Sequence, residues 1–188
     1  MLYSTKYFSP VGTIILAGDR DSIKGLWIEG QKYYAATLST DAEKYFCEGA
    51  AGNMEEKDDI PVLLTGKEWL DEYFAGKRPE ISRLPLSPEG SDFRLAVWRL
   101  LTQIPYGEVT TYGEIAKKIS FLSKMRNTSA RAVGGAVGHN PVSIIIPCHR
   151  VIGAGGNLTG YAGGIDIKIK LLRHEGVDMS GMYYEKKQ

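Results

Sequence analysis

The residues best suited to chemistry are Cys148, His149 and Arg150, which follow one another directly in the chain. A neighbouring imidazole or guanidinium can lower the pKa of a cysteine and convert its thiol into a nucleophilic thiolate. The preceding run Ile144-Ile145-Ile146 is typical of a short strand buried on both faces, and Pro147 ends it because proline has no amide hydrogen. The pattern indicates either a nucleophile at a strand end or a buried cysteine that only packs.

Several further motifs occur in a fixed order around this cysteine. They are Ile104-Pro105-Tyr106-Gly107-Glu108-Val109-Thr110-Thr111-Tyr112-Gly113-Glu114-Ile115-Ala116, Asn140-Pro141, Gly160-Tyr161-Ala162-Gly163-Gly164 and His174-Glu175-Gly176. Together with the cysteine motif they resemble the O6-alkylguanine-DNA alkyltransferases over roughly residues 85 to 177. The resemblance implies a methylated-DNA–protein-cysteine S-methyltransferase. Such a protein repairs O6-alkylguanine, and O4-alkylthymine, by irreversible transfer of the alkyl group to its own cysteine, one turnover per molecule.

The resemblance also implies the catalytic residues. Cys148 is expected to accept the alkyl group, and His149 is expected to act on the Cys148 thiol through a water. Glu175 orients the imidazole, as in other activated nucleophiles. Asn140 is expected to hold the turn around the thiol by hydrogen bonds, while Tyr112 helps to rotate the nucleotide and can protonate the leaving base.

A segment rich in alanine and glycine surrounds Arg131, between about Thr128 and Val137. Two glycines destabilise a helix by about 1 kcal/mol each relative to alanine, which suggests that close approach to DNA or to another helix is needed there. By resemblance, Arg131 enters the base stack in place of the extruded nucleotide. The other expected DNA contacts are Tyr112, Gly113, Ala130 and Gly134.

The pocket for the guanine is expected at Val151, Tyr161, Ala162 and Lys168. The resemblance implies that the backbone carbonyls of Cys148 and Val151 bind the guanine amino group. Ala162 stands where some relatives carry serine, so only its amide could reach the guanine oxygen. For Lys168, a structural role along its helix is an equally good interpretation.

The resemblance implies that the first 85 residues form a small support domain of ribonuclease H-like type. Three strands, at residues 2–9, 12–18 and 23–29, alternate with turn signals and predict an antiparallel meander. Residues 31–53 are expected to be partly helical, with Cys47 as a packing residue, and residues 49–59 to form a loop. A capping box at Thr65-Gly66-Lys67-Glu68 predicts a helix start.

Residues 86–188 are expected to form the domain that binds DNA and accepts the alkyl group. Ser91 is placed to cap one helix, and Thr111 and Glu114 form a capping box for the next. That helix and residues 128–137 predict a helix-turn-helix. A last helix covers residues 166–174, and residues after Val177 are expected to fray. The predicted fold class is α+β, with a mainly helical C-terminal part.

Composition and charge are consistent with a DNA partner. Residues 1–92 contain 10 basic and 16 acidic residues, a net charge of −6, whereas residues 93–188 contain 13 and 6, a net charge of +7. A basic half can contact the phosphates of double-stranded DNA, although uneven surface charge without a role is the simpler alternative. Two cysteines and no long apolar run indicate an intracellular protein that contacts no membrane. The resemblance implies a cytoplasmic monomer that associates with the nucleoid during repair. No metal site and no cofactor are expected.

Two other classes remain open. A DNA-binding regulator would use the helix-turn-helix alone, and the retained Cys148 argues against it. A cysteine hydrolase would need an oxyanion hole and repeated turnover, for which the basic half gives no reason.

Overall fold

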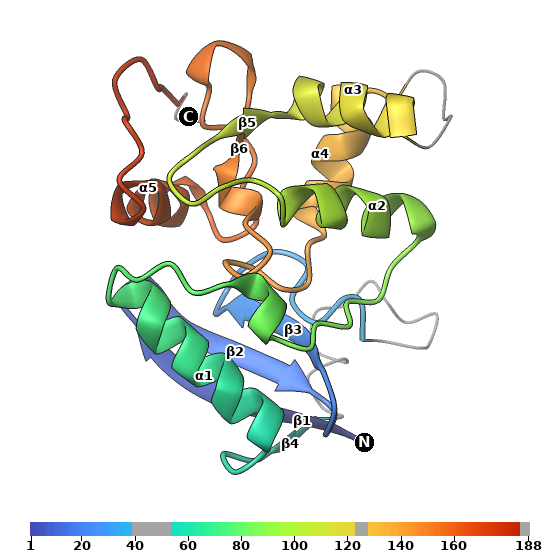
Figure 1. Ribbon diagram of the computed structural model, residues 1–188, viewed down its shortest axis with the longest axis vertical. Helices are drawn as coiled ribbons and strands as arrows, with labels where there is room; N and C mark the ends of the chain where they lie inside the picture. The colour runs from blue at the N-terminus through green and yellow to red at the C-terminus, as the bar shows by residue number, and fades with distance from the viewer. Residues whose placement is uncertain (39–53, 123–127, 185–188) are drawn as a thin grey trace. The chain divides into compact units, whose positions relative to one another are not determined.

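The computed structural model of the protein describes residues 1–38, 54–122 and 128–184 (Figure 1). The chain forms two compact units. The N-terminal unit contains Met1–Gly90 together with Pro141–Ile145, and the C-terminal unit contains Ser91–Asn140 together with Ile146–Gln188. The division therefore falls after Gly90, whereas the sequence placed it between residues 85 and 86.

The N-terminal unit is built on a four-stranded sheet. Strands β1 (Leu2–Ser9), β2 (Gly12–Gly18) and β3 (Ile23–Ile28) form the expected antiparallel meander, with Ser9 paired to Gly12 at the first turn. A fourth strand, β4 (Met54–Glu56), pairs parallel to β1 and gives the order β3-β2-β1-β4. The prediction of a loop over residues 49–59 was wrong here, because three residues with two glutamates carry no strand signal.

Helix α1 (Pro61–Phe74) packs against β1, β2 and β3 (Figure 1). It begins at Pro61 and not at the Thr65 capping box, so that prediction was wrong. Proline is favoured in the first turn because its fixed φ suits a helix, and Thr65 Oγ1 donates back to the Pro61 carbonyl at 3.1 Å. A Cβ on Gly66 would lie 2.7 Å from Leu16 Cδ2, which shows how closely the helix approaches the sheet.

Residues 31–38 form turns, and the helix expected in this segment does not begin within them. Tyr33 and Ala35 have φ angles of 60° and 50°, which a helix does not allow. Ala35 packs with Ala17 and Trp27 in a small buried cluster. Cys47 and the rest of that segment lie outside the described residues.

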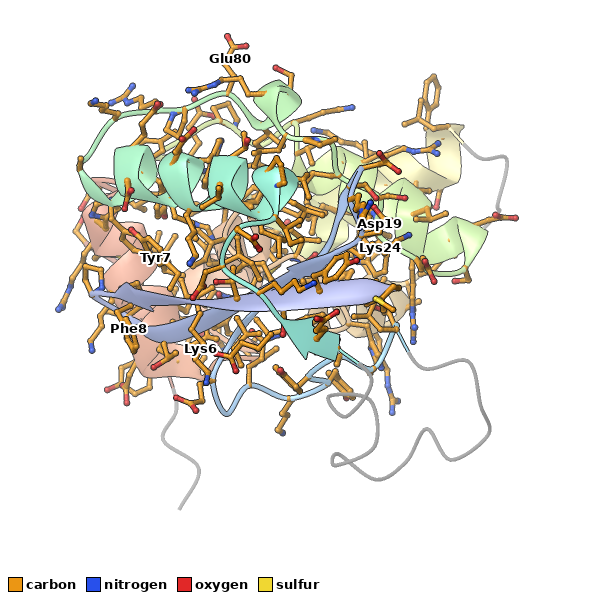
Figure 2. All side chains as sticks on the ribbon, turned by 90° about the horizontal axis from the view of Figure 1, so that it is seen from below. Lys6, Tyr7, Phe8, Asp19, Lys24 and Glu80 are labelled. Carbon is orange, nitrogen blue, oxygen red and sulfur yellow. The ribbon has the colours of Figure 1, made fainter. Side chains whose placement is uncertain are left out.

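The proline-containing connection that follows α1 is attached to strand β3. Ile23 donates its amide to the Pro85 carbonyl at 2.8 Å and accepts from the Ser87 amide at 2.9 Å. Lys24 forms ion pairs with Glu89 at 3.0 Å and Asp19 at 3.6 Å, and Figure 2 shows Lys24 beside Asp19. These contacts explain why the N-terminal unit extends to Gly90.

The three isoleucines at residues 144–146 are buried as expected, but they do not form a strand. Ile144 has a φ of 70°, a left-handed conformation that is rare for a β-branched residue, and the chain turns there. Just before it, Leu26 of β3 donates to the Pro141 carbonyl and accepts from the Ser143 amide, both at 2.8 Å. These backbone hydrogen bonds attach the segment to the N-terminal unit.

The C-terminal unit is mainly helical. Its elements are α2 (Asp92–Leu101), β5 (Thr110–Thr111), α3 (Tyr112–Leu122), α4 (Ala130–Gly138), the short turns η3 (Cys148–Arg150) and η4 (Ala154–Gly156), β6 (Val151–Ile152) and α5 (Ile165–His174). Helices α2, α3 and α4 pack on one another, and β5 pairs parallel to β6. Trp98 donates its indole N–H to the Ala136 carbonyl at 2.8 Å in the interior. The α+β fold class is thereby confirmed.

The predicted caps of two helices are present. Ser91 accepts the Arg94 amide at 3.4 Å. Thr111 and Glu114 satisfy each other's amides at 2.8 and 3.1 Å, which sets the first turn of α3. The prediction that residues after Val177 fray was wrong for residues 178–184, because Leu158 donates to Tyr183 at 2.7 Å and Tyr183 donates to Gly156 at 3.1 Å. None of the described helices is long and apolar enough to cross a bilayer.

Candidate active site

Cys148 lies in a tight turn inside the C-terminal unit. Pro147 has φ −80° and ψ 64°, the values of an inverse γ-turn, and the Cys148 amide donates to the Ile146 carbonyl at 2.7 Å. Cys148 then opens the short η3 turn, and its side chain is buried, with 3% of the residue exposed. A γ-turn, not a strand end, therefore presents the thiol.

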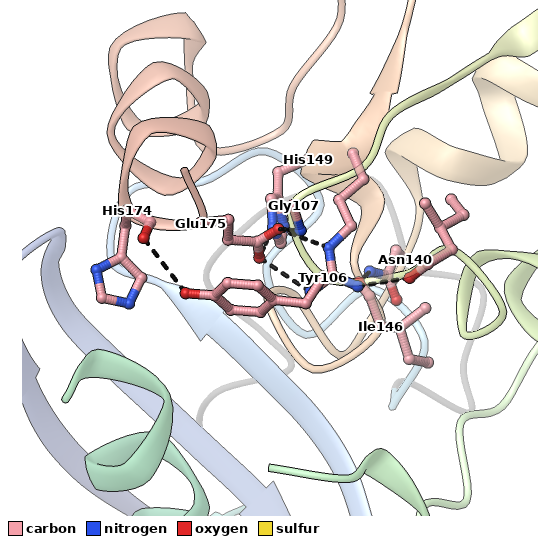
Figure 3. Close-up of polar contacts among 9 residues, drawn as sticks. Tyr106, Gly107, Asn140, Ile146, His149, His174 and Glu175 are labelled. Atoms are coloured by element: carbon pink, nitrogen blue, oxygen red, sulfur yellow. Dashed lines mark hydrogen bonds and ion pairs between the residues drawn. The ribbon is translucent and has the colours of Figure 1, made fainter. Parts of the chain in front are cut away.

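A second hydrogen bond holds the same turn. Asn140 Nδ2 donates to the Ile146 carbonyl at 2.8 Å, so that oxygen accepts both from Asn140 and from the amide of Cys148 (Figure 3). Asn140 lies two residues after Gly138, the last residue of α4, and follows the C-cap residue His139. The amide side chain thus links the end of the helix to the turn that presents the sulfur.

His149 and Glu175 form a fully buried pair. His149 Nε2 lies 2.7 Å from Glu175 Oε1, and neither side chain is exposed (Figure 3). Burial raises the pKa of Glu175, but the hydrogen bonds from His149 and Arg150, together with the charge of Arg150, outweigh it and hold the pKa well below the ordinary value. An ionised carboxylate can only accept, so His149 carries its proton on Nε2.

The other ring nitrogen of His149 is left able to act as a base. Nδ1 is buried and has no hydrogen-bond partner among the described residues. Burial lowers the pKa of His149, and the Glu175 carboxylate opposes this shift only in part. The charges of Arg150 and Lys168 lower the pKa further. A neutral imidazole with its lone pair on Nδ1 results.

Sequence reasoning missed two groups that hold Glu175. Arg150 Nε donates to Glu175 Oε2 at 2.8 Å, and a second guanidinium nitrogen donates to Oε1 at 3.0 Å. The Gly107 amide donates to Oε2 at 3.3 Å (Figure 3). Gly107 has a φ of 78°, and a Cβ there would lie 2.9 Å from the Glu175 carbonyl. The sequence signal was the Pro105-Tyr106-Gly107 turn, but a turn motif does not indicate that Gly107 contacts Glu175.

Tyr112, the first residue of α3, contacts the glycine-containing loop with its hydroxyl. The hydroxyl lies 3.1 Å from the Thr159 carbonyl and 3.0 Å from that of Gly160. Burial, together with the negative charge of a Cys148 thiolate, raises the pKa of Tyr112 to about 12. The phenol therefore keeps its proton near neutral pH.

Lys168 of α5 is fully buried next to the expected guanine pocket. Its ammonium group donates to the Val151 carbonyl at 2.6 Å and to the Thr159 carbonyl at 3.1 Å. Burial lowers the pKa of Lys168 to about 8, although a Cys148 thiolate acts in the opposite direction. One lone pair of the Val151 oxygen is thus already used.

The other two pocket residues lie in the loop before α5. The Tyr161 hydroxyl is buried and has no hydrogen-bond partner among the described residues. Burial raises the pKa of Tyr161 well above its ordinary value, and the charges of Cys148 and Glu175 raise it further. Ala162, the next residue, is half-buried.

The residues expected to contact DNA lie on α3 and α4, outside the buried hydrogen-bond network. Ala130 and Arg131 are exposed on the first turn of α4, and Gly113 is half-buried on α3. A Cβ on Gly134 would lie 3.9 Å from the Tyr112 ring, so α4 and Tyr112 approach closely. In residues 1–38, 54–122 and 128–184, no cluster of three or more His, Cys, Asp or Glu could hold a metal ion.

Known proteins match both units. Residues 2–88 match the family described as 6-O-methylguanine DNA methyltransferase, ribonuclease-like domain, and residues 92–177 match its DNA binding domain. A methylated-DNA–protein-cysteine methyltransferase of Haemophilus influenzae is 38% identical over 94% of this chain and 87% of the relative. Another, of Methanosarcina acetivorans, is 41% identical over 93% of this chain and 99% of the relative.

Solved structures give the same result. The crystal structure of Mycobacterium tuberculosis O6-methylguanine methyltransferase matches with a TM-score of 0.76 and 37% identity, covering 97% of this chain and 96% of that one. The structure of M. tuberculosis OGT in complex with DNA matches with a TM-score of 0.74 and 36% identity, covering 96% and 94%. With both units matched over nearly their whole length, the chain belongs to the 6-O-methylguanine DNA methyltransferase family.

Proposed function

We propose that this chain repairs DNA directly by moving an alkyl group from guanine O6 to the sulfur of Cys148. The observation that carries the proposal is the buried pair that begins at the residue after Cys148, in which His149 Nε2 lies 2.7 Å from Glu175 Oε1. This contact fixes the proton on Nε2 and leaves Nδ1 as the base that accepts the thiol proton, through a water.

The transfer then needs one displacement. The Cys148 sulfur attacks the alkyl carbon, the S–C bond forms, and the bond between that carbon and O6 breaks. The guanine keeps the electron pair and takes up a proton, for which the Tyr112 phenol is the proposed donor. The product is a thioether that water does not cleave, so each molecule reacts once.

The substrate is double-stranded DNA, bound as a monomer through the α3–α4 pair. The lesion base leaves the stack to reach the sulfur, and Arg131 fills the gap it leaves. Gly113, Ala130 and Gly134 allow the backbone of the two helices to approach the DNA. Val151, Tyr161, Ala162 and Lys168 surround the base. Because the substrate is chromosomal DNA, the site of action is the cytoplasm at the nucleoid.

Intact mass spectrometry tests this function. The protein is mixed with an excess of duplex DNA that contains one O6-methylguanine, and the expected result is a gain of one CH₂ unit that then stops. Peptide mapping should place it on Cys148 and not on Cys47. A Cys148→Ser variant and unmethylated DNA are the controls, and O4-methylthymine DNA tests the second lesion.

The other two classes predict different outcomes, one with the methylated duplex and one with an ester or amide substrate. Binding of the methylated duplex without any mass change would make the protein a regulator. Turnover of an ester or amide by Cys148 would make it a hydrolase. Either result would overturn the proposed function.

A further inference from the structure

We propose that Arg150 is a positioning residue for the alkyl transfer, because it holds the Glu175 carboxylate in the place and charge state that keep His149 ready to act as a base. The inference rests on the proposed function, since it concerns the same cysteine. No motif in the sequence pointed to Arg150 for this role.

The contacts of Arg150 are those of a rigid clamp. Its guanidinium donates to both carboxylate oxygens of Glu175, at 2.8 Å to Oε2 and 3.0 Å to Oε1. Oε1 is also the atom that accepts from His149 at 2.7 Å. A bidentate contact fixes the plane of the carboxylate and not only its distance, so it also sets the direction of the bond to the imidazole.

Arg150 is itself held in place. It is 6% exposed, and its remaining terminal nitrogen donates to the Ile104 carbonyl at 2.6 Å. The guanidinium carbon lies 5.6 Å from the centre of the Tyr106 ring, a cation–π contact. The Tyr106 hydroxyl donates to the His174 carbonyl at 3.3 Å, next to Glu175 in the chain. Ile104 and Tyr106 therefore hold the Arg150 guanidinium, and Tyr106 also holds the backbone next to Glu175.

The charge of Arg150 acts on both members of the pair. It helps to lower the pKa of Glu175, and it disfavours the protonated form of His149. The other groups that act on His149 are Glu175, which favours its protonation, and Lys168, which disfavours it. Tyr161 senses the charges of Glu175 and Cys148 but stays neutral because its pKa is raised.

The test measures how the reactivity of Cys148 depends on pH. The rate of its alkylation by iodoacetamide is followed from pH 5 to pH 9, with peptide mapping to count Cys47 separately. Methyl transfer from O6-methylguanine duplex is measured in parallel. The iodoacetamide assay needs no DNA, so it separates failure of the Arg150 inference from failure of the proposed function.

The acid limb of this profile is the range in which the alkylation rate falls as pH is lowered. Arg150→Met and Glu175→Gln are expected to move it in opposite directions. Arg150→Met removes a charge that opposes the imidazolium, so its limb moves to higher pH by about one unit. Glu175→Gln removes the charge that favours the imidazolium, so its limb moves to lower pH. Arg150→Lys keeps the charge and loses the bidentate geometry. Its limb should stay in place while the plateau rate falls about tenfold.

Arg99→Met, an exposed arginine on α2, is the matched control and should leave profile and plateau unchanged. If Arg150→Met leaves the acid limb unmoved, the charge role is overturned. If Arg150→Lys reacts at the wild-type rate, the geometric role is overturned. Should Arg150→Met fail to fold, Arg150→Lys still decides the inference, because a merely structural role does not predict a lower plateau rate at an unchanged acid limb.

Discussion

The ammonium group of Lys168 donates to the backbone carbonyl of Val151 over 2.6 Å, and no part of this lysine is exposed. The same group donates to the Thr159 carbonyl at 3.1 Å. One buried cation thus connects α5, β6 and the loop after Leu158, the three segments that surround the proposed guanine pocket. Tyr112 contacts the same Thr159 oxygen, so the connection continues to α3.

Replacing Lys168 with methionine should destabilise the protein. The two carbonyl oxygens would lose their charged donor in the interior, and the expected loss in the free energy of unfolding is about 2 kcal/mol. Urea unfolding of both proteins measures it. Lys170→Met, at an exposed position on the same helix, should change the free energy by less than about 0.5 kcal/mol. Equal losses for the two variants would contradict the structural role of Lys168.

The stability contributed by Lys168 should depend on pH in the alkaline range. Burial lowers the pKa of Lys168 from 10.5 to about 8 in the folded protein. Between those values the unfolded chain binds one proton more than the folded chain, so the wild type gains stability as pH rises. The difference in unfolding free energy between wild type and Lys168→Met should grow by up to about 1.4 kcal/mol per pH unit. A difference that stays constant from pH 8 to 10 would show that the lysine titrates normally.

Tyr112→Phe should separate catalysis from folding. The phenol donates to a carbonyl of the 159–160 loop, so its loss should lower the free energy of unfolding by only about 1 kcal/mol. Methyl transfer should slow about 100-fold, because the departing guanine loses its proton donor. Quenched-flow measurement of transfer from methylated duplex checks the rate, and Tyr183→Phe, at an exposed position, serves as the control. A variant that transfers at the wild-type rate would remove Tyr112 from the mechanism.

Local chemistry made part of this fold predictable. The three strands of the meander follow from alternating side chains and turn residues, and β1–β3 end within one residue of the predicted positions. The start of α3 follows from Thr111 and Glu114, three residues apart, whose reciprocal hydrogen bonds need no distant partner. Two local predictions failed. The helix predicted to begin at Thr65 begins earlier because a proline occupies its first turn, and the strand predicted at residues 144–146 does not form because Ile144 adopts a left-handed conformation.

The candidate site depends on long-range contacts that no local pattern encodes. Glu175 and Gly107 are 68 residues apart, and the partner of Arg150 lies 25 residues away. From the sequence, Arg150 was interpreted as a guanidinium that lowers the pKa of the nearby Cys148, not as a partner of Glu175. Only the burial of residues 141–152 shows that it points inward. For the same reason the sequence did not indicate that Pro141–Ile145 joins the N-terminal unit.

Arg131→Ala should slow the reaction with duplex DNA and leave the chemical step at Cys148 unchanged. Arg131 is exposed on α4 and has no part in the contacts of Cys148, His149 or Glu175 described above. Transfer from methylated duplex should slow, because nothing then fills the stack after the base leaves it. Reaction with free O6-methylguanine base should keep its wild-type rate. The slope of log affinity against log salt should also fall by about one. Equal slowing with duplex and free base would place Arg131 in the chemical step.

Methylation of Cys148 should destabilise the protein. Cys148 is 3% exposed, and every residue from Pro141 to Ile152 is buried, so a methyl group on the sulfur has little free space. Overpacking of this kind costs about 1 to 3 kcal/mol. For a chain of this length, that corresponds to a fall in Tm of about 2 to 4 °C per kcal/mol.

Scanning calorimetry before and after reaction with a stoichiometric amount of methylated duplex, with the DNA removed, measures the change. Cys148→Ala protein treated in the same way should show none, which separates the effect of the methyl group from that of handling. Equal Tm values for the free and the methylated protein would mean that the turn around Pro147 already has room for the alkyl group.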